Sequence, residues 1–159
     1  MCIRDSLSTA TDDDVRFLVQ RHIKPTPRQG VAIPIPGIHA AIDLSDGLLF
    51  DLAHICEASQ VSAVVQTQAL PISQPLQNIG CDPIKSALTG GEDYELCLIV
   101  APDQIEGLQR RAQISGVAVT KVGSIVQANG SGPQVQLEGW SDEQVLQLKR
   151  RGFTHFKEH

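Results

Sequence analysis

Short apolar segments typical of strands are interleaved with segments of helical periodicity, and their order repeats no strict strand–helix–strand unit. The predicted strands cover residues 40–42, 61–66, 94–100, 117–126 and 135–137. The turn sequence Asn-Gly-Ser-Gly at 129–132 predicts a hairpin between the last two strands, which implies antiparallel pairing. We therefore expect an α+β fold in which helices pack against a mixed sheet.

Helices are predicted from apolar residues at helical spacing and from capping residues at the ends. The predicted helices are a first from Thr11 to just before Pro25, a second after Ser45 or Asp46, a third between Asp82 and Gly90, and a fourth from Pro102 to near Gly116. The tail from residue 140 has no strong period apart from Val145 and Leu148.

Composition and charge exclude several classes of function. The 159 residues are 42% hydrophobic and 19% charged, which suits one soluble domain. The 18 acidic residues outnumber the 13 Lys and Arg, and no basic block occurs, so a nucleic-acid partner is not expected. No apolar run is long enough to span a membrane. The four cysteines form no C-x-x-C pair, which favours reduced thiols and a cytoplasmic location.

The first chemically informative segment is Asp-Leu-Ser-Asp-Gly at 43–47, placed where a predicted strand meets a predicted helix. If the chain turns there, Asp43 and Asp46 face one point, and Mg²⁺ binds one or two carboxylates together with phosphate oxygens and water. The N-terminus of the following helix would add partial positive charge for a phosphate. Capping of the helix by Ser45 and Asp46 is the alternative interpretation.

The second segment is Gly-Gly-Glu-Asp-Tyr-Glu-Leu at 90–96, in which two glycines and three acids lead into an apolar strand. Acidic side chains beside a core strand are costly unless they bind something or stay hydrated. A polar turn before an edge strand is the alternative interpretation.

Together these segments resemble the thiamine-monophosphate kinase family, in Ala-Ile-Asp-Leu-Ser-Asp-Gly-Leu at 41–48 and Ala-Leu-Thr-Gly-Gly-Glu-Asp-Tyr-Glu-Leu at 87–96. The segments Pro-Thr-Pro-Arg at 25–28 and Arg-Gly-Phe-Thr-His-Phe at 151–156 are similar as well. The run at 90–96 is quite specific, whereas Asp-x-Ser-Asp-Gly-Leu is shared with the aminoimidazole-ribonucleotide-synthetase-like superfamily. The resemblance implies the C-terminal-domain fold of that superfamily.

The resemblance implies a phosphoryl transfer from ATP to thiamine phosphate that yields thiamine diphosphate and uses Mg²⁺. It implies Asp43 and Asp46 as magnesium ligands, Ser45 as an ATP contact, and Glu92 and Phe153 as contacts of the thiamine substrate; no catalytic residue is assigned. A phosphate acceptor is already ionised, so catalysis reduces to positioning and charge neutralisation. The cationic thiazolium ring suits a carboxylate and an aromatic face.

The domain organisation is expected partly from the residues, since 1–6 fit no helix or strand period, and partly from the resemblance. Residues 1–6 are expected to be a non-native leader, 7–38 a helix and proline-rich connection from a missing N-terminal domain, and 39–159 the C-terminal kinase domain. The intact enzyme is expected to be a homodimer, and this chain alone is expected to be inactive. Two alternatives stay open: another ATP-using synthetase of the superfamily, or a non-catalytic remnant that binds a ligand or forms oligomers.

Three further residues carry expectations of their own. Asp51 is expected to be an exposed helix carboxylate rather than a metal ligand. Trp140 is expected to pack in the core or at an interface rather than to line a substrate pocket. For Arg28, a bidentate phosphate contact and a structural salt bridge are equally weighted.

Overall fold

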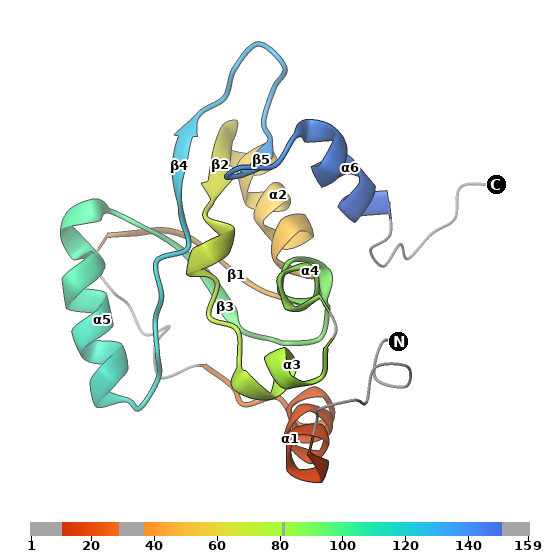
Figure 1. The fold of residues 1–159 in the computed structure, drawn as a ribbon. Helices are drawn as coiled ribbons and strands as arrows, with labels where there is room; N and C mark the ends of the chain where they lie inside the picture. The colour runs from red at the N-terminus through yellow and green to blue at the C-terminus, as the bar shows by residue number, and fades with distance from the viewer. Residues whose placement is uncertain (1–10, 29–36, 81, 151–159) are drawn as a thin grey trace.

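The computed structural model describes residues 11–28, 37–80 and 82–150. The expected α+β fold is confirmed, because helices pack against strands that pair in both senses (Figure 1). The helices are α1 (Asp12–Ile23), α2 (Leu48–Ser59), α3 (Gln74–Asn78), α4 (Pro83–Thr89), α5 (Ile105–Ile114) and α6 (Asp142–Arg150), with short 3₁₀ helices η2 (Thr67–Ala69) and η3 (Pro102–Gln104). The strands are β1 (Ile38–Asp43), β2 (Val61–Val65), β3 (Leu96–Val100), β4 (Gly123–Gln127) and β5 (Val135–Leu137).

Strands β1 and β3 form a two-stranded antiparallel sheet. Strand β3 is apolar at every position because it is covered on both sides. Its Cys97 and Ile99 pack against the main core, whereas Leu98 and Val100 pack against Leu108 on α5. In Figure 1, α5 accordingly lies apart from α2, with β3 between the two helices.

A second sheet has the strand order β4-β2-β5, and here the predicted hairpin is wrong. Strand β4 pairs antiparallel with β2, and β5 pairs parallel with the opposite edge of β2. The turn at 129–132 does form, with an Asn129–Gly132 bridge, but the chain then crosses the end of β2. The crossing places Val135 and Leu137 against the core, where each is 3% exposed. Burial of these two side chains outweighs the local preference for a hairpin.

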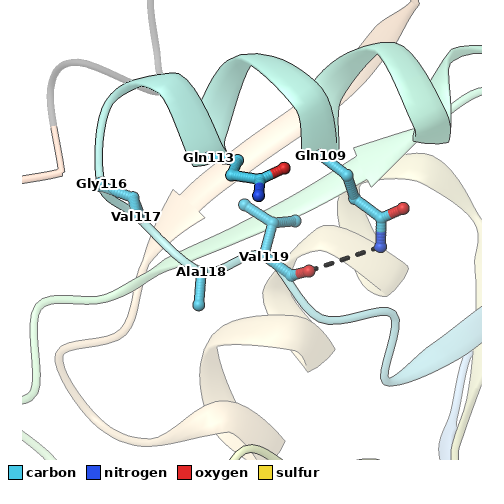
Figure 2. Close-up of a pocket in the computed structure, with 6 residues that line it drawn as sticks. All are labelled: Gln109, Gln113, Gly116, Val117, Ala118 and Val119. Carbon is cyan, nitrogen blue, oxygen red and sulfur yellow. Dashed lines mark hydrogen bonds between the residues drawn. The ribbon is translucent and has the colours of Figure 1, made fainter.

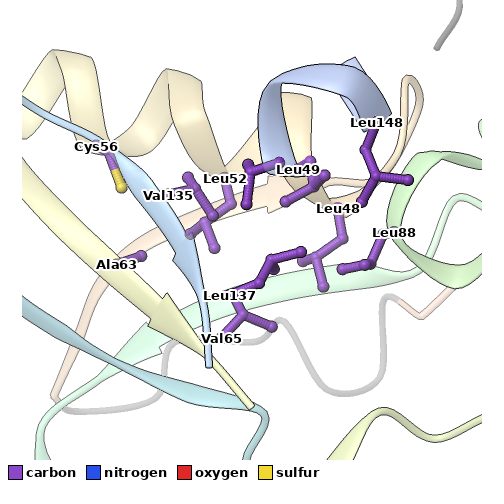
Figure 3. Packing of buried hydrophobic residues seen from close by; sticks show 11 residues of the cluster. Leu48, Leu49, Leu52, Cys56, Ala63, Val65, Leu88, Val135, Leu137 and Leu148 are labelled. Carbon is purple, nitrogen blue, oxygen red and sulfur yellow. The ribbon is translucent and has the colours of Figure 1, made fainter. Parts of the chain in front are cut away.

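The main core lies between α2 and the three-stranded sheet, and α4 and α6 close its end (Figure 3). Leu49 and Leu52 of α2 face Val65 of β2 and Leu137 of β5. Leu148 of α6 completes the cluster, so the weak periodicity of the tail corresponds to a helix. Trp140 packs against the same cluster, as expected for a core-packing role.

Capping explains where several helices begin. Thr11 and Asp14 form the predicted capping box of α1, and Asp82 caps α4 by accepting from Lys85 N at 3.0 Å. Ser141 and Gln144 form the same reciprocal pair before α6, a signal that the sequence analysis missed. The expected strand at 117–126 is shorter and covers only 123–127.

Among the described helices, none is both long and apolar enough to cross a membrane. The two cysteines in the described residues, Cys56 and Cys97, are not joined in a disulfide. The expected leader at 1–6 and the predicted contact residue Phe153 lie outside the described residues.

The fully buried Leu49 yields a stability prediction. Because its side chain is 0% exposed, Leu49→Ala leaves a cavity between α2 and the sheet. We expect it to lower the free energy of unfolding by about 2–5 kcal/mol in urea denaturation. Leu146→Ala is the matched control, because Leu146 is 48% exposed on α6 and should change stability by less than about 0.5 kcal/mol. Equal losses in the two variants would contradict this placement of the core.

Candidate functional site

The antiparallel pairing of β1 with β3 brings the two acidic segments together. In this register Asp43, the last residue of β1, lies opposite Leu96, the first residue of β3. The segment 44–47 follows β1 and the segment 90–95 precedes β3, so both emerge from the same end of the sheet. Segments separated by about forty residues of sequence therefore form one surface.

Backbone hydrogen bonds continue from the strands into the two loops. Leu44 donates its N–H to the carbonyl of Glu95 at 2.8 Å, and Tyr94 donates to the carbonyl of Leu44 at 2.9 Å. Glu92 donates to the carbonyl of Ser45 at 2.8 Å. These bonds fix the relative position of the two acidic segments before any ligand is considered.

Glycines allow this close approach. Gly47 has φ of +107°, and a Cβ there would lie 2.9 Å from the carbonyl carbon of Thr89. A Cβ on Gly91 would lie 2.5 Å from the carbonyl oxygen of Ser45. Gly90 directly follows α4, as expected, but its φ of −74° is not left-handed. A Cβ there would lie 2.5 Å from the carbonyl oxygen of Ser86, so this glycine serves close packing.

The structure brings four of the five predicted site residues to this surface. Asp43 and Glu92 are exposed, and Ser45 and Asp46 are half-buried in the loop after β1. Glu92 has φ of +67°, an unusual backbone conformation for a residue that is not glycine. The strained backbone directs this side chain from a loop that hydrogen bonds hold in place.

The alternative in which Ser45 or Asp46 caps α2 is not what the structure shows. The N-cap of α2 is Gly47, and no side chain makes a cap hydrogen bond there. Capping of α2 therefore does not account for Ser45 or Asp46. The positive end of the α2 dipole lies directly beside them.

The carboxylates of Asp43 and Asp46 are of the kind that Mg²⁺ binds. Carboxylate oxygens are the protein ligands that Mg²⁺ prefers, and it usually keeps several waters and phosphate oxygens around one or two carboxylates. Asp43 and Asp46 supply two such groups. No cluster of three or more His, Cys, Asp or Glu able to hold a metal occurs in residues 11–28, 37–80 and 82–150. The other ligands of a magnesium ion here would therefore be phosphate, water or groups outside the described residues.

Asp51 is buried, contrary to the expectation of an exposed carboxylate. Its side chain on α2 is 2% exposed, and Oδ2 accepts from the backbone N–H of Asp46 at 3.0 Å and of Gly47 at 3.1 Å. Across the core, burial raises the pKa of the Cys97 thiol to about 11, with smaller contributions from Cys56 and Asp51. A sequence signal existed, because Asp51 falls on the apolar face of α2 beside Leu48 and Leu52.

Glu95 ties the N-terminal helix to the second acidic segment. Arg28 binds Glu95 in a bidentate manner, with Nε to Oε2 at 2.8 Å and an Nη to Oε1 at 2.7 Å, and Arg21 of α1 binds the same carboxylate. For Arg28 the structural salt bridge is thus the arrangement found. Partial burial by itself raises the pKa of Glu95, but the hydrogen bonds and charges of Arg28 and Arg21 outweigh it and lower the pKa overall.

The neighbouring Asp93 shows the opposite shift. Partial desolvation raises the pKa of its carboxyl, and repulsion from Glu95 raises it further, although Arg21 and His22 act in the other direction. The crowding of negative charge in this segment makes it more favourable for a cation than for another anion.

A shallow hollow beside α5 is separate from this surface (Figure 2). Its lining residues are all uncharged: Gln109, Gln113, Gly116, Val117, Ala118 and Val119. Gln109 already donates to the carbonyl of Val119 at 3.4 Å. The lining therefore offers no charged side chain to a ligand.

Comparison with known proteins identifies the family. Residues 4–136 match the AIR synthase related protein family in its C-terminal domain. The chain belongs to this family. It is 42% identical over 154 residues to the thiamine-monophosphate kinase of Haemophilus influenzae, an alignment that covers 94% of this chain and 46% of that protein. The chain therefore spans about half the length of the curated relatives that it matches.

Solved structures agree with the AIR synthase related fold. The thiamine-monophosphate kinase of Stenotrophomonas maltophilia superposes with a TM-score of 0.73 at 39% identity, covering 82% of this chain and 42% of the other. A structure of AaThiL complexed with AMPPCP and TMP superposes with a TM-score of 0.67 at 28% identity, covering 84% and 41%. The family and fold expected from the sequence resemblance are thus confirmed.

The Glu95 contacts predict a pH-dependent contribution to the stability of this AIR synthase related domain. Glu95→Gln removes the negative charge shared by Arg21 and Arg28, and we expect a loss of about 1–2 kcal/mol at pH 7, since partial exposure screens the pairs. A lowered pKa means that this stability is present above the ordinary value of 4.5 and is lost as the pH falls through the folded value.

Urea denaturation of wild type and Glu95→Gln between pH 7 and pH 3 measures this effect. The difference in free energy of unfolding should be full at pH 7 and should shrink below about pH 4.5. Glu106→Gln, at an exposed position on α5, is the control and should differ little from wild type at either end. A difference for Glu95→Gln that grows towards acid pH would contradict the assignment.

The same substitution at two glycines should have opposite effects. Gly91→Ala forces a Cβ against the Ser45 carbonyl and should destabilise the domain by about 1–3 kcal/mol. Gly107→Ala adds a Cβ that meets nothing within 4 Å on α5 and should stabilise by about 0.5–1 kcal/mol through helix propensity. Thermal unfolding of both variants measures the two signs, and stabilisation by Gly91→Ala would rule out the close approach of the loops.

Proposed function

We propose that this chain is the C-terminal half of an ATP-dependent kinase that converts thiamine monophosphate to thiamine diphosphate. The observation that carries the proposal is the junction of the 43–47 and 90–95 loops, where hydrogen bonds between main-chain groups hold exposed carboxylates at one surface. The thiamine-monophosphate kinases among the relatives and the AaThiL complex with AMPPCP and TMP support the choice of substrates.

Within this proposal four residues of the junction, together with Phe153 outside the described residues, have separate roles. Asp43 and Asp46 hold Mg²⁺, Ser45 contacts ATP, and Glu92 with Phe153 contacts the thiamine moiety. Bound magnesium supplies charge neutralisation for the phosphates. The uncapped N-terminus of α2 attracts phosphate by its dipole, and the Glu92 carboxylate attracts the thiazolium cation. The acceptor phosphate is already ionised, so no side chain of this surface has to remove a proton.

The proposal includes partners beyond the chain. We place the remaining contacts for metal and nucleotide on an N-terminal domain, since this chain spans about half the length of its thiamine-monophosphate kinase relatives. The intact enzyme is proposed to be a homodimer in the cytoplasm. The 159-residue chain by itself is proposed to bind these ligands weakly and to lack kinase activity.

A chimeric enzyme tests the kinase proposal. The chain is fused to the N-terminal half of the Haemophilus influenzae relative, with which it shares 42% identity, and thiamine diphosphate formation from ATP is measured. Asp46→Asn and Asp43→Asn should each lower kcat/KM by about 100-fold, because each removes a carboxylate that would hold the Mg²⁺ ion neutralising the phosphates. Asp103→Asn, an exposed aspartate on η3, is the matched control and should retain activity.

The outcomes separate the alternatives. A chimera that is folded by circular dichroism but phosphorylates a different acceptor would favour another synthetase of the superfamily. Calorimetric titration of the 159-residue chain with Mg²⁺ and thiamine phosphate gives a second reading. Absence of any binding heat, together with an inactive folded chimera, would favour a non-catalytic remnant. Full activity of Asp46→Asn would contradict its role in metal binding.

A further inference from the structure

We propose that Asp51 is a positioning residue for this surface, which holds the loop of Asp46 and Gly47 without touching substrate or metal. The inference rests on the proposed function for what the loop binds. The restraint that Asp51 places on the backbone of Asp46 and Gly47 is a property of the chain itself and can be measured without any ligand.

The geometry of the contact carries the inference. One oxygen of Asp51, Oδ2, accepts from two consecutive N–H groups, those of Asp46 at 3.0 Å and Gly47 at 3.1 Å. Fixing two successive peptide groups sets the direction in which the Asp46 side chain leaves the backbone. The carboxylate reaches back from the first turn of α2, so the loop is held by the helix that follows it.

Gly47 explains why such a hold is needed. Its φ of +107° is accessible because it has no side chain, and a residue without Cβ restricts its own backbone least. Without the Asp51 contact, the turn between β1 and α2 would sample other conformations. A buried carboxylate that accepts two N–H bonds supplies the restriction that glycine lacks.

The hold extends to the second acidic segment. The carbonyl oxygens of Leu44 and Ser45, next to the fixed peptides, accept from the N–H groups of Tyr94 and Glu92. A shift of the 44–47 backbone would therefore break the bonds that position Glu92. Asp51 thus acts on both loops through the main chain.

The burial of Asp51 argues that this contact is specific. The side chain is 2% exposed on the apolar face of α2, where a carboxylate is costly unless it is hydrogen-bonded. An apolar residue at this helical position would fill the core without that cost. The Asp51 side chain instead places an acceptor oxygen against two N–H donors of the loop.

Amide hydrogen exchange by NMR on the ligand-free 159-residue chain tests the inference. In Asp51→Ala, the amides of Asp46 and Gly47 should exchange about 10-fold faster or more, after correction for global stability, and those of Glu92 and Tyr94 should follow. Asp51→Asn keeps an oxygen that can accept both bonds, so it should lie between Asp51→Ala and wild type. Ser62→Ala is the matched control. Ser62 of β2 is also 2% exposed, and its Oγ accepts a hydrogen bond from the backbone N–H of Gln134 at 3.1 Å.

A second readout links the loop to metal binding. Mn²⁺, as a paramagnetic substitute for Mg²⁺, should broaden the amide signals near Asp43 and Asp46 in wild type. The apparent Kd for Mn²⁺ should rise about 10-fold or more in Asp51→Ala and less in Asp51→Asn, as is typical when a partner that orients a ligand is lost. Ser62→Ala should bind Mn²⁺ as wild type does.

Each outcome decides a defined point. If Asp51→Ala and Ser62→Ala both speed exchange only in proportion to global stability, Asp51 is merely part of the core and the inference is overturned. Unchanged Mn²⁺ affinity in Asp51→Ala would overturn it as well. If wild type itself shows no broadening by Mn²⁺, the metal assignment under the proposed function fails, while the exchange rates still decide whether Asp51 positions the loops.

Discussion

The candidate site depends on the antiparallel pairing of β1 with β3. Because the strands run in opposite directions, the loop that leaves β1 and the loop that enters β3 lie at the same end of the sheet. Three further main-chain hydrogen bonds prolong the ladder into these loops. Strand β3 can hold this position because the main core and α5 cover its two sides. The arrangement of the acidic loops is thus a consequence of core packing, and it exists without a ligand.

Four of the carboxylates around these loops form two pairs with different physical roles. Asp51 and Glu95 are engaged by protein donors, the first by two backbone N–H groups and the second by two arginines. Asp43 and Glu92 are exposed at the surface. A buried carboxylate needs donors to offset its desolvation, whereas an exposed one keeps its hydration and stays available for a cation. Asp51 and Glu95 thus stabilise the loops, whereas the exposed carboxylates of Asp43 and Glu92 face solvent.

Local signals predicted a large part of the fold. The capping box at Thr11 and Asp14, the N-cap Asp82, and the apolar periodicity of α2 and α5 depend on neighbours within one helical turn, and the structure has each of them. The hairpin prediction was wrong because strand pairing does not depend on local sequence alone. The turn at 129–132 forms as its glycines predict, but the choice between β4 and β2 as partner of β5 depends on where Val135 and Leu137 can be buried. No local pattern contains that information.

The sequence by itself determined the family, the α+β class, and which residues carry charge beside the predicted strand ends. These follow from residue identity and short-range spacing. Only the tertiary structure decided that Asp51 is buried and turned back on the loop, that Arg28 pairs with Glu95, and that β5 lies parallel to β2. Each of these depends on which groups meet across the core. Such contacts form between residues distant in sequence, and their free energy is set by burial and hydrogen bonding that arise only once the chain has folded.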